Sequence, residues 1–163
     1  MFDMDPVEEL RYLVLAAQRD GSRRLTEALR PLGVTPSQSE VLTVLAASDG
    51  GLSVKELGSL LVCEAGSPSR LARSVVAAGL AESVPDERDG RVTRLRLTAT
   101  GTDVAAQVAR IEAGFHDQLA TAVGDPATLT FLIATLRSVV SDGPAGAALT
   151  RRRESAEPGE VGS

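Results

Sequence analysis

The sequence of 163 residues is poor in the side chains that most often perform catalysis or hold metal ions, because it contains one cysteine and one histidine. A single cysteine excludes an intramolecular disulfide framework, and a single histidine excludes a histidine-based metal cluster. Aromatic residues make up 2% of the chain and tryptophan is absent, which disfavours a pocket built on aromatic stacking. We therefore expect that the protein is not an enzyme and that it uses no cofactor and no metal ion.

The sequence also lacks a long apolar run, since none approaches the ~18 residues that a membrane-spanning helix requires. The first residues, Met1–Asp5, are acidic where a secretory signal would be basic. These two absences predict a cytoplasmic protein that makes no contact with a membrane. With 43% hydrophobic residues, the chain has the length and composition of one domain with a substantial core.

Negative charge predominates over the whole chain, with 22 acidic and 17 basic residues and a formal net charge of −5. The distribution is uneven, because residues 65–97 carry 6 basic and 4 acidic side chains while both flanking segments are net negative. Positive charge is therefore concentrated in one segment, where it favours contact with a polyanion such as DNA. The acidic flanks oppose non-specific binding and make affinity strongly dependent on salt.

Apolar periodicity predicts a mainly α (α+β) chain in four parts. Residues 1–34 contain a long helix from Pro6 to Leu32 whose middle is apolar on nearly all sides, so it needs burial on more than one face. Residues 98–142 contain two more helices, separated at Gly124-Asp125-Pro126, and residues 143–163 lack periodicity and are expected to form a disordered tail. The terminal helices have more apolar surface than one small domain covers, which predicts an interlocked homodimer.

Residues 35–97 carry the pattern of a helix–turn–helix. Its first helix begins at a capping box, with Ser53 as the N-cap and Glu56 reaching back to it. After a turn at Val62–Gly66, the second helix begins with Ser67 as its N-cap and Pro68 at its first position. At about 100° per residue, this second helix has an apolar face, Leu71, Val75 and Ala78, opposite a polar face, Ser69, Arg70 and Arg73. Such a helix can read bases in a major groove, although a solvated polar face is the simpler interpretation of the helix alone.

A β-hairpin is predicted directly after this helix. Two strand-like runs, Ala81–Pro85 and Val92–Leu97, flank a charged tip that closes at Asp89-Gly90, which is a strong hairpin signal. The tip carries Arg88 and Arg91, and an arginine held on a hairpin suits the narrow, negative minor groove of DNA. Taken alone, the tip is equally well explained as a solvated turn, but a helix–turn–helix followed by a charged hairpin is much less expected by chance. The second strand alternates inward and outward side chains, namely Leu95 and Leu97 against Arg94 and Arg96.

With these motifs, residues 35–141 resemble the multiple-antibiotic-resistance-regulator (MarR) family of winged-helix transcription factors. The resemblance is carried by Leu52–Leu57, Ser69–Leu71, Gly79-Leu80, Asp86–Arg91 and Leu97–Gly101. It implies a winged helix-turn-helix with N- and C-terminal dimerisation helices, a homodimer, and a palindromic double-stranded operator. It also implies that Arg91 enters the minor groove and that Asp89 orients it by a salt bridge. The chain departs from the family in two respects, because Gly90 replaces a second basic residue and Ala65–Pro68 replace a more polar start to the recognition helix.

The resemblance further implies that a small-molecule effector binds between the dimerisation helices and the winged helix. Tyr12 and His116 are the polar side chains that we expect nearest to that cleft, although a packing or surface role is the simpler interpretation of His116. Cys63, in the turn of the helix–turn–helix, is a candidate redox switch. The neighbouring Glu64 disfavours its thiolate, and we expect instead a buried small hydrophobic side chain.

The sequence therefore predicts a DNA-binding transcriptional regulator that acts as an effector-responsive repressor. The side chains expected to contact DNA are Ser67, Pro68, Ser69, Arg70, Arg73, Arg88, Asp89 and Arg91. The alternative, from another class of protein, is a winged helix that serves as a protein-interaction module without operator binding. The acidic balance of the chain and the glycine at position 90 permit that alternative.

Overall fold

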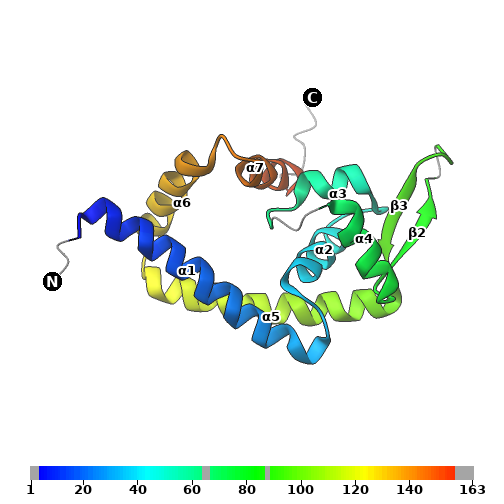
Figure 1. The fold of residues 1–163 in the computed structure, drawn as a ribbon, viewed down its shortest axis with the longest axis horizontal. Coiled ribbons are helices and arrows are strands. Elements are labelled where there is room, and N and C mark those ends of the chain that lie inside the picture. Colours follow the sequence, from blue (N-terminus) through cyan, green and yellow to red (C-terminus); the bar gives the residue numbers. More distant parts are fainter. Residues whose placement is uncertain (1–3, 64–66, 87–88, 157–163) are drawn as a thin grey trace. The chain divides into compact units, whose positions relative to one another are not determined.

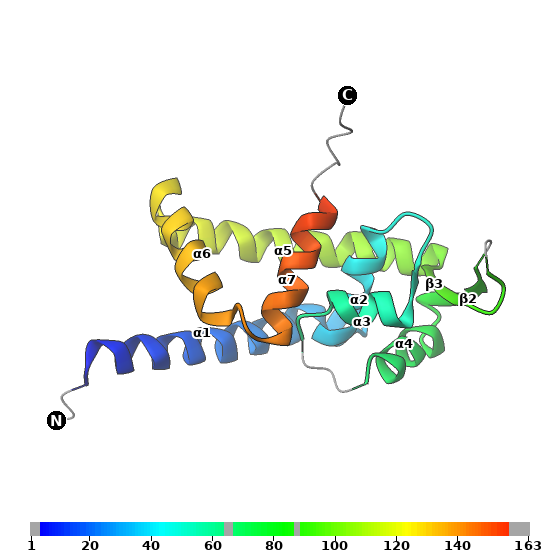
Figure 2. The ribbon, with the colours of Figure 1, turned by 90° about the horizontal axis from the view of Figure 1, so that it is seen from above.

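The computed structural model describes residues 4–63, 67–86 and 89–156, and Figures 1 and 2 show its helices and strands. It divides into two compact units, Met1–Pro36 and Ser37–Ser163. In chain order the elements are α1 (Pro6–Leu29), the 3₁₀ helix η1 (Arg30–Leu32), α2 (Pro36–Ala46), β1 (Leu52–Ser53), α3 (Val54–Leu60), α4 (Pro68–Ala77), β2 (Ala81–Pro85), β3 (Thr93–Leu97), α5 (Ala99–Val123), α6 (Pro126–Val140) and α7 (Pro144–Ala156). The predicted α+β class with a winged helix-turn-helix is confirmed.

Helix α1 forms most of the first unit. Asp5 caps its N-terminus, where the carboxylate accepts a hydrogen bond of 2.8 Å from the N–H of Val7, and Pro6 occupies the first helical position. The helix predicted to run to Leu32 is α-helical to Leu29 and finishes in the 3₁₀ turn η1. Many of its apolar side chains are exposed in the single chain, among them Val7, Leu10, Leu13, Val14 and Leu15.

The second unit contains the winged helix, in which α2, α3 and α4 share a core with a three-stranded antiparallel sheet of order β1-β3-β2. This core consists of Val41, Val44, Leu45, Leu57, Leu71, Ala72, Val75, Ala81 and Leu95. Strands β2 and β3 form the predicted hairpin, with Ala81 opposite Leu97 and Pro85 opposite Thr93. Strand β1, which pairs Leu52 with Leu95, was not predicted, because two residues are too few to show an alternating pattern.

The start of α3 is the predicted capping box. The N–H of Glu56 donates to Ser53 Oγ at 3.2 Å, and Glu56 Oε2 accepts from the N–H of Ser53 at 2.7 Å. Ser67 is the N-cap residue of α4 and Pro68 holds its first position, as predicted, but the hydroxyl of Ser67 makes no capping hydrogen bond with the described residues. The N–H of Arg70 is the usual donor to such a hydroxyl, and here it donates instead to the carbonyl of Ser67 at 2.9 Å.

Helix α5 begins where the wing ends, at a very close contact with the chain before the hairpin. Thr98 caps the helix, because its Oγ1 accepts the N–H of Gly101 at 3.0 Å while donating to the carbonyl of Gly79 at 2.7 Å. A Cβ at position 101 would lie 1.7 Å from the carbonyl oxygen of Leu80. Only glycine fits there, which gives a steric reason for the Leu-Thr-x-x-Gly pattern that follows the wing.

Helix α6 follows the predicted break at Gly124-Asp125-Pro126. Asp125 is its N-cap and accepts the N–H groups of Ala127 and Thr128 at 3.0 Å each. The helix exposes a long set of apolar side chains, namely Leu129, Phe131, Leu132, Ile133, Leu136, Val139 and Val140. Among the described residues no single helix is both long and apolar enough to cross a membrane, and α5 and α6 meet these two requirements only as a pair, across a bend of 106°.

The prediction of a disordered tail over residues 143–163 is wrong for its first part, because Pro144–Ala156 form helix α7. Helix α7 packs against α3 (Figure 1), and its Ala148 is only 1% exposed. Arg152 donates from Nε to the carbonyl of Leu60 at 2.7 Å. The segment is ordered by contacts with residues far away in the sequence, which its own periodicity does not reveal. Residues 157–163 of the predicted tail lie outside the described part of the chain.

Candidate nucleic-acid interface

Helix α4 has one buried and one exposed face, as its sequence predicts. Leu71 and Val75 pack into the core. The opposite face presents the exposed side chains Ser69, Arg70 and Arg73. Ala78, which was predicted on the buried face, is exposed because α4 ends one residue earlier and Ala78 is its C-cap. The exposed face thus offers a hydroxyl and two guanidinium groups from consecutive turns of one helix.

The N-terminus of α4 rests directly on α3. A Cβ at Gly58 would lie 2.8 Å from Cγ of Pro68, so the absence of a side chain at Gly58 lets the proline ring approach. Pro68 is half-buried while Ser67 before it is exposed. Pro68 therefore has a packing role beside the DNA contact that the sequence predicts for it, and α3 sets the position at which α4 begins.

A groove of about 430 Å³ lies between α4 and the hairpin. Its polar lining comes from both elements, with Ser69 and Arg73 on α4 and Ser83 and Thr93 on the strands. Its apolar lining includes Val54, Ala72, Val76 and Leu95. The two elements that were predicted to contact DNA therefore present polar side chains to the same hollow.

Two aspartates organise the tip of the hairpin. Asp86 Oδ1 accepts the N–H of Asp89 at 3.0 Å, and Asp89 Oδ1 accepts the N–H of Arg91 at 3.1 Å. Between the described side chains of Asp89 and Arg91 no ion pair forms, so this backbone hydrogen bond replaces the salt bridge that the resemblance implied. Arg91 is exposed. Arg88, the other predicted arginine of the tip, lies outside the described residues.

The alternation of Arg94 and Arg96 with leucines predicted that both arginines face water, but both are hydrogen-bonded to other parts of the protein. Arg94 donates through Nε to Asp86 and through Nη1 to the carbonyl of Gly51 at 2.9 Å, and it forms an ion pair with Glu56 at 3.4 Å. Its hydrogen bond with Asp86 raises the pKa of Arg94 further above its ordinary value. Arg96 donates through Nε to the carbonyl of Gly50 at 2.9 Å. These two arginines attach the wing to the loop before β1, a role that only the folded structure reveals.

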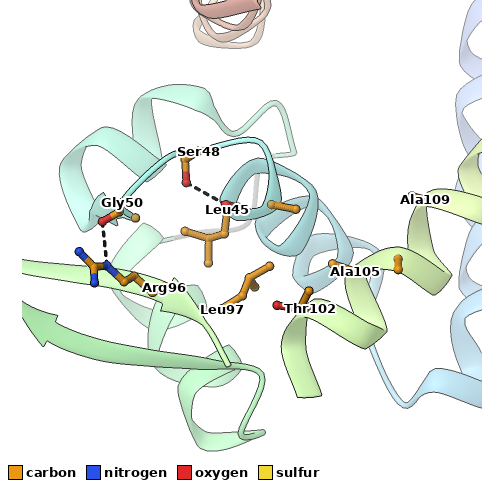
Figure 3. Close-up of a pocket in the computed structure, with 11 residues that line it drawn as sticks. Leu45, Ser48, Gly50, Arg96, Leu97, Thr102, Ala105 and Ala109 are labelled. Carbon is orange, nitrogen blue, oxygen red and sulfur yellow. Dashed lines mark hydrogen bonds between the residues drawn. The ribbon is translucent and has the colours of Figure 1, made fainter. Parts of the chain in front are cut away.

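A second pocket, of about 470 Å³, is lined by residues of α2, β3 and α5 (Figure 3). Its walls are mostly small or apolar, including Leu45, Leu97, Ala105, Ala106 and Ala109, and its polar groups are Ser48, Arg96 and Thr102. The predicted effector residues Tyr12 and His116 are not among the residues that line it. Tyr12 is exposed on α1, with the guanidinium of Arg11 4.3 Å from its ring centre, and His116 is exposed on α5.

Cys63 lies in the turn after α3 and is half-buried rather than buried. The carboxylate of Glu40, on α2, accepts the N–H of Val62 at 2.7 Å and the N–H of Cys63 at 2.9 Å. Burial, together with the hydrogen bond to Glu40 and its negative charge, raises the pKa of the Cys63 thiol to about 11. The predicted opposing carboxylate, Glu64, lies outside the described residues, and sequence proximity could not have indicated Glu40. The thiol is protonated at neutral pH, which opposes a redox role.

Comparison with known proteins shows which sequences and structures this chain resembles. Residues 32–92 match the sequence profile of the MarR family. No curated protein sequence matches the chain. Among solved structures, the chain is similar to a MarR family transcriptional regulator from Silicibacter pomeroyi, with 25% identity, a TM-score of 0.65, and coverage of 82% of this chain and 88% of that one.

Two further solved structures share the fold. One is AbsC, a MarR family transcriptional regulator from Streptomyces coelicolor, with 23% identity, a TM-score of 0.71, and coverage of 86% of this chain and 97% of that one. The other is a mutant MarR from E. coli complexed with operator DNA, with 23% identity, a TM-score of 0.70, and coverage of 86% and 99%. The matched segment contains the helix–turn–helix and the first strand and tip of the hairpin, and the structural likeness extends over the flanking helices. Residues 32–92 of this chain therefore match the MarR family model, and the chain shares the winged-helix fold of these structures.

Proposed function

We propose that this protein is a transcriptional regulator that binds a palindromic operator in double-stranded DNA as a homodimer and acts as an effector-responsive repressor. The observation that carries the proposal is the arrangement of α4 and the wing. The exposed face with Ser69, Arg70 and Arg73 adjoins the same groove as the hairpin, whose tip exposes Arg91. Arginines of this face suit guanine edges in a major groove, and an arginine on the wing suits the adjacent minor groove.

Two kinds of comparison support this proposal. The matched family consists of regulators of this fold, and one of the solved structures with the same fold is complexed with operator DNA. The distribution of charge agrees, because residues 65–97 are net positive in an otherwise acidic chain. Binding that depends on a small positive surface with acidic surroundings is expected to be strongly salt-dependent.

The homodimer is supported by apolar side chains that a single chain leaves in water. Phe131 on α6 is 70% exposed and Val7 on α1 is 76% exposed, and both helices carry several further exposed aliphatic side chains. Many exposed large apolar side chains on one helix are typical of an interaction surface in soluble proteins. A two-fold dimer built on them would present two α4 helices to one side of DNA, and a palindromic operator requires them about one helical turn, ~34–36 Å, apart.

The effector and the repressor mode follow from the family resemblance. The pocket of about 470 Å³ beside α2 and α5 offers one place where a small molecule would contact both the winged helix and a terminal helix. Tyr12 and His116 stay predictions for a cleft that involves the dimerisation helices. A ligand that binds one arrangement of the dimer better than another would change operator affinity by its differential affinity for the two.

Footprinting on the intergenic DNA beside the gene of this protein tests the proposal. We expect a protected palindrome, with log affinity falling linearly as log salt concentration rises. A non-specific footprint, or none at low salt, would favour the protein-interaction module instead. That alternative has one structural observation in its favour, because Arg94 and Arg96 are hydrogen-bonded to backbone carbonyls of the protein.

A further inference from the structure

We propose that Arg152 on α7 is a positioning residue for the helix–turn–helix, holding the end of α3 and the turn after it in the arrangement that binds operator DNA. The inference rests on the proposed function. It starts from a contact between segments far apart in sequence, because α7 packs against α3 (Figure 1). Two arginines of α7 donate hydrogen bonds to the last turn of α3.

The C-terminus of α3 is short of hydrogen-bond partners within its own chain segment. Helix α3 has only seven residues and ends at Leu60, after which Leu61 is extended, so its last carbonyl groups cannot bond to a following turn. Arg152 Nε donates to the carbonyl of Leu60 at 2.7 Å, and Arg151 Nη1 donates to the carbonyl of Ser59 at 3.2 Å. Two cations at this end also complement the partial negative charge of the helix dipole.

The same guanidinium fixes the turn through a second residue. Arg152 Nη2 forms an ion pair with Glu40, whose carboxylate also accepts the N–H groups of Val62 and Cys63. Glu40 is largely shielded from water, with its side chain 14% exposed, and that of Arg152 is 31% exposed. Arg152 therefore bridges a helix end and the carboxylate that holds the turn, which needs a planar group with several donors in a fixed geometry.

This arrangement is connected to α4, the helix proposed to contact the bases. The ring of Pro68, at the first position of α4, rests on Gly58 of α3 with no room for a Cβ between them. A shift of the C-terminal turn of α3 would therefore move the contact on which α4 begins. Arg152 acts on DNA binding through α3 and Glu40, and the direction in which α4 presents Ser69 and Arg70 depends on it.

The test compares two variants that keep the charge of the chain. Arg152→Lys retains the positive charge but cannot bridge Leu60 and Glu40 with a planar fork, whereas Arg153→Lys makes the same change one residue later, where the side chain lines a separate pocket with Val140 and Leu149. We expect Arg152→Lys to lower operator affinity at least tenfold and to leave affinity for random-sequence DNA within twofold. Arg153→Lys should change neither. A direct phosphate contact by Arg152 would weaken both kinds of DNA equally and would overturn the proposal.

Amide hydrogen exchange on free protein gives a readout that needs no DNA. The N–H groups of Val62 and Cys63 should exchange at least fivefold faster in Arg152→Lys than in wild type, while those in the middle of α5 keep their rates. Wild-type exchange and wild-type operator affinity in Arg152→Lys would overturn the proposal. If the wild-type protein itself binds no operator, the proposed function fails, and faster exchange in the variant would still support the contact between α7 and the turn.

Discussion

Replacement of Arg91 by alanine tests the wing more sharply than any other single change. Arg91 is exposed and its described contact is made by its backbone N–H to Asp89, which alanine retains. The free energy of unfolding should therefore change by no more than about 0.5 kcal/mol. Each charged hydrogen bond lost from the complex is worth ~1.5–3 kcal/mol. A dimer has two wings, so operator affinity should fall by about 10²–10⁴-fold at low salt.

The salt dependence of operator affinity gives a second quantity that can be measured for Arg91→Ala. Each lost phosphate neutralisation makes the slope of log affinity against log salt shallower by about 0.9, so two wings predict a change of about 1.8. Fluorescence anisotropy over a salt series measures both quantities, with circular dichroism as the test of folding. Arg110→Ala is the matched control, because it removes one exposed arginine from α5, outside α4 and the wing. Unchanged operator affinity in a folded Arg91→Ala protein would refute a DNA contact by this arginine.

Four further results are expected. Burial raises the pKa of Glu40, but hydrogen bonds from Cys63 and Val62 and the charge of Arg152 lower it overall. The stability that ionised Glu40 contributes is therefore present at neutral pH and is lost as the pH falls below about 4.5. In thermal melts, the stability of Glu40→Gln should depend less on acid pH than that of the wild type. With a pKa of about 11, Cys63 should react with iodoacetamide at pH 8 on the order of 100-fold more slowly than a free thiol, and peroxide should not release DNA. Deleting residues 144–163 should lower the melting temperature, contrary to what a disordered tail predicts, because α7 supplies the bonds to Ser59 and Leu60. Phe131→Asp should give monomers by light scattering, and a stable dimer would contradict the proposed use of α6.

Local signals predicted most of the elements of this fold. The capping box of Ser53 and Glu56, the restart at Asp125 and the hairpin around Asp89-Gly90 each depend on residues within a few positions of one another, so the sequence alone shows them. The exposed face of α4 was predictable for the same reason, because helical periodicity fixes which side chains share a side.

What could not be predicted depends on partners that are distant in sequence. The sequence predicts that Arg94 is a solvated strand residue, whereas in the fold its guanidinium contacts Asp86 and the carbonyl of Gly51. Helix α7 has little amphipathic pattern and many small residues, so its order is visible only when α3 lies beside it. The partner of Cys63 is Glu40, which lies on another helix. Each failure concerns a contact between segments that are distant in the sequence.

The use of these arginines bears on how an acidic protein would bind DNA. Because Arg94 and Arg96 hold the wing to the loop at Gly50 and Gly51, fewer guanidinium donors are available for direct contact with phosphates than the six arginines of residues 65–97 suggest. The same bonds fix the hairpin before any encounter, so its immobilisation costs little conformational entropy when DNA binds. Direct contacts with phosphates are thereby reduced, whereas the energy of a correctly placed Arg91 is retained. The operator affinity of such a protein depends more on the fit of its side chains to the DNA than on its overall charge. It should therefore discriminate its operator from random DNA most strongly at moderate salt, where non-specific binding is already weak.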